Sequence, residues 1–159
     1  MDKQALIAQI LDQLERQLQE ALQAADEAHQ NATHSESQAE TQYDTLGLEN
    51  AYLAHGQSMR VEALQQALAC YRQLPLPEFS PQMAIGIGAL VQVEDDERQS
   101  LYLIGPLAGG MQLQLDGQPV RLVTPESPIG TELIGKQLGD EVRLRRAGQE
   151  LLAEITDLQ

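Results

Sequence analysis

The sequence has few residues of several kinds, and each shortage excludes a class of protein. It contains one cysteine, Cys70, so an intramolecular disulfide cannot form. No apolar run approaches the roughly 18 residues that a membrane-spanning helix needs. The beginning of the chain is amphipathic and acidic, without the basic and then apolar order of a signal peptide. We therefore expect a protein of a reducing, bacterial-type cytoplasm with no membrane partner.

Basic residues are also scarce. The 159 residues include 10 Lys and Arg against 24 Asp and Glu, which gives a formal net charge of −14. Capture of free nucleic acid by a basic surface needs clustered Lys and Arg, so the composition argues against it. A basic or metal-bearing partner fits this charge better.

Neither Gly nor Pro occurs before Gly47, and the chain before it has a helical period. Apolar residues follow one another at steps of four and three, as in a heptad seam: Ile7, Leu11, Leu14, Leu18, Ala21, Ala25, Ala28 and Ala32. The pattern predicts one long helix from about residue 3 to the mid-thirties. Because the seam changes from Ile and Leu to Ala, its far end should bury less apolar area.

A second helical pattern covers about residues 49–74, with Val61, Leu64, Leu68 and Tyr71 at matching spacing. Cys70 is expected to widen this apolar face. The segment between the two patterns is short, so an antiparallel hairpin is the simplest connection. We therefore predict a coiled-coil hairpin over residues 1–74, with an acidic tip at about residues 33–49.

Three prolines, Pro75, Pro77 and Pro81, interrupt the helical pattern and predict a linker over residues 75–82. After it the period changes to two. Ile85, Ile87, Ala89, Val91 and Val93 are expected on one side of a strand, and the dipeptides at 116–117 and 147–148 are expected to form hairpin turns. Residues 83–159 are thus predicted to form a small antiparallel sheet with one short helix after residue 128, and the whole chain is of the α+β class.

Residues 127–142 read SPIGTELIGKQLGDEV, which resembles the signature of the C-terminal domain of the GreA/GreB transcript-cleavage factors. Residues 88–93 and 103–105 resemble the strand segments that precede this signature in the family. The phrase Glu49-Asn50-Ala51-Tyr52 is similar to the family's sequence near the hairpin tip. The resemblance implies an FKBP-like fold for residues 83–159 and a coiled-coil hairpin before it.

The resemblance also implies a function. In the family, the hairpin enters the secondary channel of RNA polymerase, and an Asp and a Glu at its tip complete the polymerase's own active centre. The matching residues are Asp44 and Glu49, which would hold a Mg²⁺ ion shared with polymerase during cleavage of backtracked RNA. The chain itself would not be an enzyme, would contact nascent RNA only indirectly, and would not bind the ion tightly when free.

Two alternatives remain open. Four residues separate Asp44 from Glu49, a longer spacer than in the family, and no Lys or Arg occurs between Arg16 and Arg60, which suits a regulator that occupies the channel without cleavage. An FKBP-like fold also suggests a prolyl isomerase or chaperone-like module, although a single Phe and no Trp leave little to line an aromatic pocket. We expect a monomer, and a homodimer joined through the seam from Ile7 to Leu18 is compatible with each function.

Other residues that could take part in metal binding, catalysis or phosphate binding are interpreted as structural. The three histidines lack the spacing of a helical metal pair, so we expect them on the surface. Cys70 should fill the helical seam beside Ala67, where a thiol has no basic neighbour to activate it. Gly135 and Gly139 are interpreted as turn residues, since no long helix follows them as it would in a phosphate-binding loop.

Overall fold

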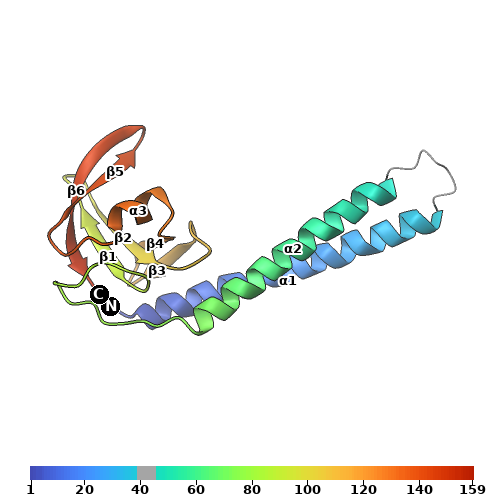
Figure 1. The fold of residues 1–159 in the computed structure, drawn as a ribbon, viewed down its shortest axis with the longest axis horizontal. Coiled ribbons are helices and arrows are strands. Elements are labelled where there is room, and N and C mark those ends of the chain that lie inside the picture. The colour runs from blue at the N-terminus through green and yellow to red at the C-terminus, as the bar shows by residue number, and fades with distance from the viewer. Residues whose placement is uncertain (39–45) are drawn as a thin grey trace. The chain divides into compact units, whose positions relative to one another are not determined.

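A computed structural model of the chain describes residues 1–38 and 46–159, with side chains described for residues 1–31, 48–49 and 53–159 (Figure 1). Two long helices are followed by a six-stranded sheet and one short helix, which confirms the α+β class. The elements are α1 (Lys3–Gln38), α2 (Leu46–Arg72), β1 (Leu90–Glu94), β2 (Gln99–Ile104), β3 (Gln112–Leu115), β4 (Gln118–Val123), α3 (Pro128–Leu133), β5 (Glu141–Arg146) and β6 (Gln149–Leu158).

The chain forms two compact units, which we name the hairpin unit and the β unit. The hairpin unit is Leu11–Arg72, and the β unit is Met1–Ile10 together with Gln73–Gln159. The sequence placed residues 1–74 in the hairpin, whereas the first ten residues belong to the β unit. The side-chain amide of Gln9 explains part of this, because it donates to the backbone oxygen of Gln114 at 2.6 Å and accepts from the Gln114 nitrogen at 2.9 Å.

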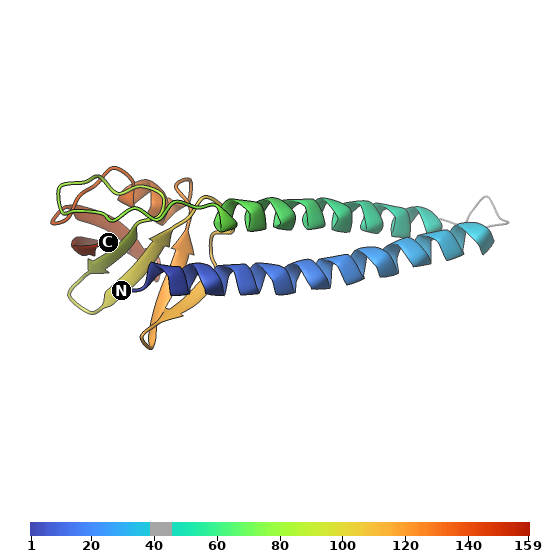
Figure 2. The same cartoon turned by 90° about the horizontal axis from the view of Figure 1, so that it is seen from below.

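In the hairpin unit, α1 and α2 lie side by side (Figure 2). Leu14 of α1 and Leu68 of α2 are buried at seam positions that the heptad pattern identified, and Arg72 forms an ion pair with Glu15 at 3.0 Å. Beyond Ala21, none of the described side chains of α1 is fully buried. The apolar core of the arm therefore thins along its length, as a seam of alanines requires.

The strand order in the β unit is β3-β4-β2-β1-β6-β5. Neighbours are antiparallel except β2 and β4, which run parallel with Leu101 opposite Val120 and Leu103 opposite Leu122. The sequence prediction of a purely antiparallel sheet missed this pair. The reason is topological, since β4 follows β3 through a tight hairpin and then pairs with β2 on its other side.

Both hairpin turns that the sequence predicted are present. Asp116 and Gly117 have φ values of 51° and 79° between β3 and β4, and Ala147 and Gly148 have values of 51° and 78° between β5 and β6. Two successive residues with positive φ match the two-residue turns that suit the twist of antiparallel strands. These turns fix the register of both hairpins.

The predicted strand beginning at Ile85 is wrong at its start, because β1 begins at Leu90 and Ile87 is exposed. Gly88 interrupts the strand with a φ of 92°. A β-carbon at Gly88 would lie 2.9 Å from the backbone oxygen of Pro75, so a close approach of the linker requires glycine there. The period of two in this segment thus reflected burial at single positions and not one continuous strand.

The sheet has apolar residues buried on both faces. One face carries a cluster that includes Val91, Ile104, Val123 and Ile155, and α3 adds Leu133 to it. Residues of the opposite face are also buried: Leu101, Leu103, Leu113, Val120 and Leu122. A sheet buried on both faces needs cover on both. In the same unit, the start of α1 supplies three further buried side chains, those of Leu6, Ile7 and Ile10.

Lys3 joins the start of α1 to the linker. Its ammonium donates to the backbone oxygens of Pro77 at 2.6 Å and Gly88 at 3.1 Å, and it lies 5.2 Å from the centre of the Phe79 ring. Partial burial lowers the pKa of Lys3, and the nearby Glu78 carboxylate opposes that shift. The segment that the sequence assigned to a linker is therefore hydrogen-bonded into the β unit.

Candidate functional site

The sequence predicted a pair of carboxylates at the hairpin tip. Glu49 lies in the first turn of α2 and is exposed, whereas Asp44 lies outside the described residues. A carboxylate is favoured at a helix start because unpaired backbone N–H groups there carry partial positive charge. Glu49 is therefore available to solvent at the start of α2, and the pairing with Asp44 stays a prediction.

The surface beside Glu49 is shallow and partly apolar. A depression of about 450 Å³ is lined by Glu49, Leu53, Gly56 and Gln57, and the side chains of Leu48 and Leu53 are each 59% exposed. Within residues 1–38 and 46–159, no group of three or more His, Cys, Asp and Glu side chains could hold a metal ion by itself. Glu49 is the one carboxylate among the residues that line this depression.

The described part of the hairpin is acidic and its carboxylates have few cationic partners. Asp12 pairs with Arg16 and Glu15 with Arg72, but Asp26 and Glu27 accept hydrogen bonds from glutamine amides, of Gln30 at 3.1 Å and Gln23 at 3.2 Å. Amides leave the negative charge of these carboxylates uncompensated. This arm would repel a polyanion.

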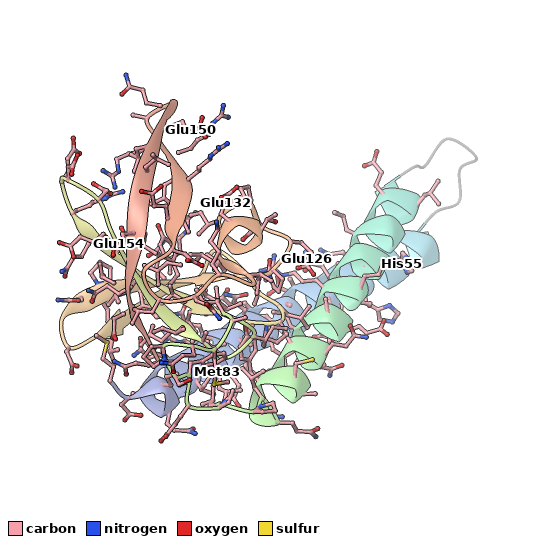
Figure 3. All side chains as sticks on the ribbon, turned by 60° about the vertical axis from the view of Figure 1, so that its left-hand side comes forward. His55, Met83, Glu126, Glu132, Glu150 and Glu154 are labelled. Atoms are coloured by element: carbon pink, nitrogen blue, oxygen red, sulfur yellow. The ribbon has the colours of Figure 1, made fainter. Side chains whose placement is uncertain are left out.

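Two further predictions about the hairpin have different outcomes. His29 and His55 are exposed, which confirms the surface interpretation for these two histidines, and Figure 3 shows His55 on α2. The prediction for Cys70 was wrong, since its thiol is exposed. The buried positions nearby are Ala67, Leu68 and Tyr71, and each residue of a helix is turned by about 100° from the one before it, so Cys70 points away from the direction that these three share. Cys70 therefore falls outside the seam.

The 127–142 signature lies in the β unit, where it builds the short helix α3. The hydroxyl of Ser127 accepts from the Gly130 nitrogen at 3.0 Å and donates to the Thr124 oxygen at 2.7 Å, which caps the helix start. A β-carbon at Gly130 would lie 1.8 Å from the Thr124 oxygen. Only glycine fits there, and Pro128 in the first turn has the φ that a helix start needs.

The rest of the signature makes turns and joins segments. Gly135 and Gly139 have φ values of 84° and 87°, which confirms that they are turn residues. The Gly135 nitrogen donates to the Ile85 oxygen at 3.0 Å, and the Asp140 carboxylate accepts from the Gln137 nitrogen at 2.8 Å. The signature therefore specifies a fold, and within the described residues it assembles no catalytic group.

An ion pair that no sequence motif predicts joins the turn between β1 and β2 to the end of β5. Asp95 is bonded to Arg146, and Glu97 accepts from the same guanidinium at 3.2 Å. The hydrogen bond from Arg146 lowers the pKa of Asp95 to about 2, and the backbone N–H of Glu97 acts in the same direction. Asp95 correspondingly raises the pKa of Arg146. These residues fasten the β1–β2 turn to the end of β5, which is a structural role.

The β unit also contains a cavity of about 850 Å³ between α3, β4 and β5. Its lining includes Arg121, Arg143 and Arg145. No Phe, Tyr or Trp is among the lining residues.

Comparison with known proteins identifies the family. The family described as "Transcription elongation factor, GreA/GreB, C-term" matches residues 80–159, half of the chain. The chain belongs to the GreA/GreB family of transcription elongation factors. Factors of the GreA/GreB family act on RNA polymerase and are accessory factors, not catalysts themselves.

Among solved structures, the chain is similar to GreA factor homolog 1 (Gfh1) of Thermus thermophilus, with 22% identity, 94% of each chain covered and a TM-score of 0.38. It is also similar to Gfh1 of Thermus aquaticus, with 20% identity, 92% of each chain covered and a TM-score of 0.39. A GreA/GreB factor of Nitrosomonas europaea is 15% identical over 60% of this chain and 78% of that one, with a TM-score of 0.38. A search of curated proteins gives no match. Across residues 1–38 and 46–159, none of the helices has the length and apolar character to span a membrane.

Proposed function

We propose that this chain binds bacterial RNA polymerase, inserts the hairpin of α1 and α2 into the secondary channel, and stimulates cleavage of backtracked RNA. The observation that carries the proposal is the exposed carboxylate of Glu49 in the first turn of α2, in a chain whose second half belongs to the GreA/GreB family. Under this function the protein acts as a monomer in the cytoplasm. Its contact with nascent RNA is indirect.

Asp44 and Glu49 are the residues that would hold a shared Mg²⁺ ion. Carboxylate oxygens are the donors that Mg²⁺ prefers, and this ion usually keeps several waters and binds through one or two carboxylates. The donor set of the hairpin fits that pattern, because Glu49 is exposed and no larger group of ligands surrounds it in the described part of the chain. When bound between factor and polymerase, Mg²⁺ supplies charge neutralisation at the phosphodiester and an activated water.

The contribution of this chain is therefore to hold and orient the shared Mg²⁺ ion. Glu49 offers carboxylate oxygens from the first turn of α2, where its side chain is exposed. The remaining catalytic apparatus belongs to polymerase, so purified protein without polymerase has no cleavage activity in this proposal. It also binds Mg²⁺ weakly, because two carboxylates leave most of the coordination shell to water.

The test is cleavage of nascent transcript in a stalled, backtracked elongation complex. Wild type should shorten the RNA in a Mg²⁺-dependent manner, and Asp44→Ala and Glu49→Ala should each slow cleavage at least tenfold, which is about 1.4 kcal/mol of transition-state stabilisation. Glu62→Ala is the matched control, since Glu62 is an exposed glutamate of the same helix. A polymerase pull-down with each variant separates lost binding from lost chemistry.

A regulator that binds the channel without cleavage is the second candidate. The favouring observations are the four-residue spacer between Asp44 and Glu49 and the absence of any Lys or Arg between Arg16 and Arg60. In that case the protein binds polymerase and slows nucleotide addition, but leaves the backtracked RNA intact. Absence of polymerase binding refutes both candidates.

A prolyl isomerase or chaperone-like function has less support. Its only basis is the FKBP-like fold, and a fold alone does not specify an activity. The 850 Å³ cavity of the β unit has arginines where an isomerase pocket of that kind would present aromatic rings.

A further inference from the structure

The 850 Å³ cavity of the β unit has an unusual charge for this chain. Arg121 of β4 and Arg143 and Arg145 of β5 line it, against the two carboxylates of Glu132 and Glu150. In Figure 3, Glu132 lies on α3 and Glu150 near the turn between β5 and β6. The lining is therefore slightly positive in a protein with a net charge of −14. A local excess of guanidinium groups favours an anionic occupant.

The cavity also reaches the edge of the sheet. Successive side chains of a strand point to opposite faces, yet Arg143, Leu144 and Arg145 all line it. A hollow lined by three consecutive residues of β5 reaches either both faces of this strand or its backbone. β5 is one of the two outermost strands of the described sheet and pairs with β6 alone, so its other edge presents unpaired backbone N–H and C=O groups.

The arginines that line the cavity have few competing partners. Arg143 faces Glu150 at 3.8 Å, but the two side chains are 71% and 62% exposed, and such surface pairs contribute little. Arg121 and Arg145 form no ion pair with any residue that the structure describes. Arg146, next along the strand, is instead held by Asp95 and Glu97. The guanidinium groups of the cavity are thus the ones left for a ligand.

We propose that this edge binds an extended acidic segment of a partner protein, which adds to β5 as a seventh strand and places its carboxylates on Arg143 and Arg145. Residues two apart on an added strand point to the same side, so carboxylates at alternate positions match two arginines that are also two apart. Nucleic acid fits less well, because it has no peptide backbone to pair with the unpaired N–H and C=O groups of β5. The proposal does not depend on cleavage at the hairpin tip.

The first probe is a fluorescein-labelled peptide of sequence Glu-Thr-Glu-Val-Glu-Thr, titrated with full-length protein and followed by fluorescence anisotropy. Arg143→Glu and Arg145→Glu should each weaken binding at least tenfold. Arg60→Glu is the matched control with the same charge change on an exposed residue of α2, and it should bind as wild type does. Circular dichroism melts verify that the variants are folded.

Two altered peptides test the carboxylate–arginine contacts and the strand pairing separately. Replacing Glu by Gln removes the charge, and replacing Thr and Val by Pro removes the N–H groups that an added strand needs. Both changes should abolish binding. In NMR spectra, amide signals of residues 141–146 should shift on addition of the original peptide.

Several results would overturn the proposal. They are the absence of binding up to millimolar peptide, equal binding by Arg143→Glu and Arg145→Glu, equal binding of the Gln or Pro peptide, or unchanged amide signals in β5. Self-association of wild type that Arg143→Glu abolishes would show that a second copy covers this edge, and would overturn it as well. Transcript cleavage by the Arg143→Glu protein reports separately on the tip.

Discussion

Gly130→Ala tests whether the signature acts through the fold. The added β-carbon would lie 1.8 Å from the Thr124 oxygen and 2.7 Å from its carbonyl carbon, well inside van der Waals contact. The Thr124–Ser127 turn would have to move by more than an ångström, because backbone and not a flexible side chain is in the way. That movement breaks the hydrogen bonds of the Ser127 hydroxyl to the Thr124 oxygen and the Gly130 nitrogen.

The expected loss of stability follows from the two hydrogen bonds of the Ser127 hydroxyl. A lost N-cap costs about 1 kcal/mol. Each further hydrogen bond costs about 1 kcal/mol, and residual strain adds to the sum, so we expect roughly 2–4 kcal/mol in the free energy of unfolding. For a unit of this size that corresponds to a fall of roughly 10–25 °C in Tm. Urea unfolding of the full chain, followed by circular dichroism, measures the midpoint and the m-value together.

Two other glycines of the β unit provide graded controls. Gly135→Ala meets no atom within 4 Å but would place alanine at a φ of 84°, which costs about 1–2 kcal/mol. Gly86→Ala meets neither obstacle, so its effect should be within about 0.5 kcal/mol of wild type. The reasoning is refuted if Gly130→Ala is no more destabilising than Gly135→Ala.

Three further substitutions test other parts of the structure by urea unfolding. Asp95→Asn should flatten the loss of stability in acid: Arg146 holds the pKa of Asp95 at about 2, below the ordinary 3.8, so the stabilisation is complete above pH 4 and disappears as the pH falls toward 2. An unchanged acid limb would contradict that linkage. Gly56→Ala should stabilise α2 by about 0.5–1 kcal/mol, since helix-interior glycine is unfavourable and the site is open; a destabilised variant would show that the space is needed. Gln9→Ala should cost about 1 kcal/mol and speed amide exchange in β3, because Gln114 loses two hydrogen bonds; unchanged exchange would argue against that contact.

The hairpin shows what periodicity can and cannot predict. Leu14, Leu68 and Tyr71 were identified as seam residues because their spacing repeats, and all three are buried. Leu6 and Ile10 were missed, since they lie outside the seam and belong to the β unit, formed mostly by residues more than sixty positions away. Amphipathic spacing identifies a helical face, but it does not say which partner covers that face.

The residues of the candidate sites could likewise be predicted from the sequence only in part. Glu49 could be proposed from sequence because the family pattern places a glutamate there; the structure shows it exposed in the first turn of α2, and its role stays a prediction. The Asp95–Arg146 pair was not predicted, because its members are 51 positions apart in the sequence and neither belongs to a motif. The arginines of the cavity were likewise hidden, since Arg121 lies on β4, which is not a neighbour of β5 in the sheet, and only the folded unit brings it to the same cavity as Arg143 and Arg145. Such sites depend on topology, which local sequence does not encode.

The most recognisable part of this sequence and the part proposed for chemistry are different segments. Residues of the 127–142 signature are constrained by contacts on the ångström scale, as Gly130 and Ser127 illustrate, so family resemblance there reports on α3 and its turns. Nothing in those contacts constrains how far apart two carboxylates lie at the hairpin tip. A chain could therefore keep the whole signature and either retain or lose cleavage. The spacer between Asp44 and Glu49 is where the two candidate functions diverge, and comparison of Asp44→Ala with Glu49→Ala on one backtracked complex addresses that difference directly.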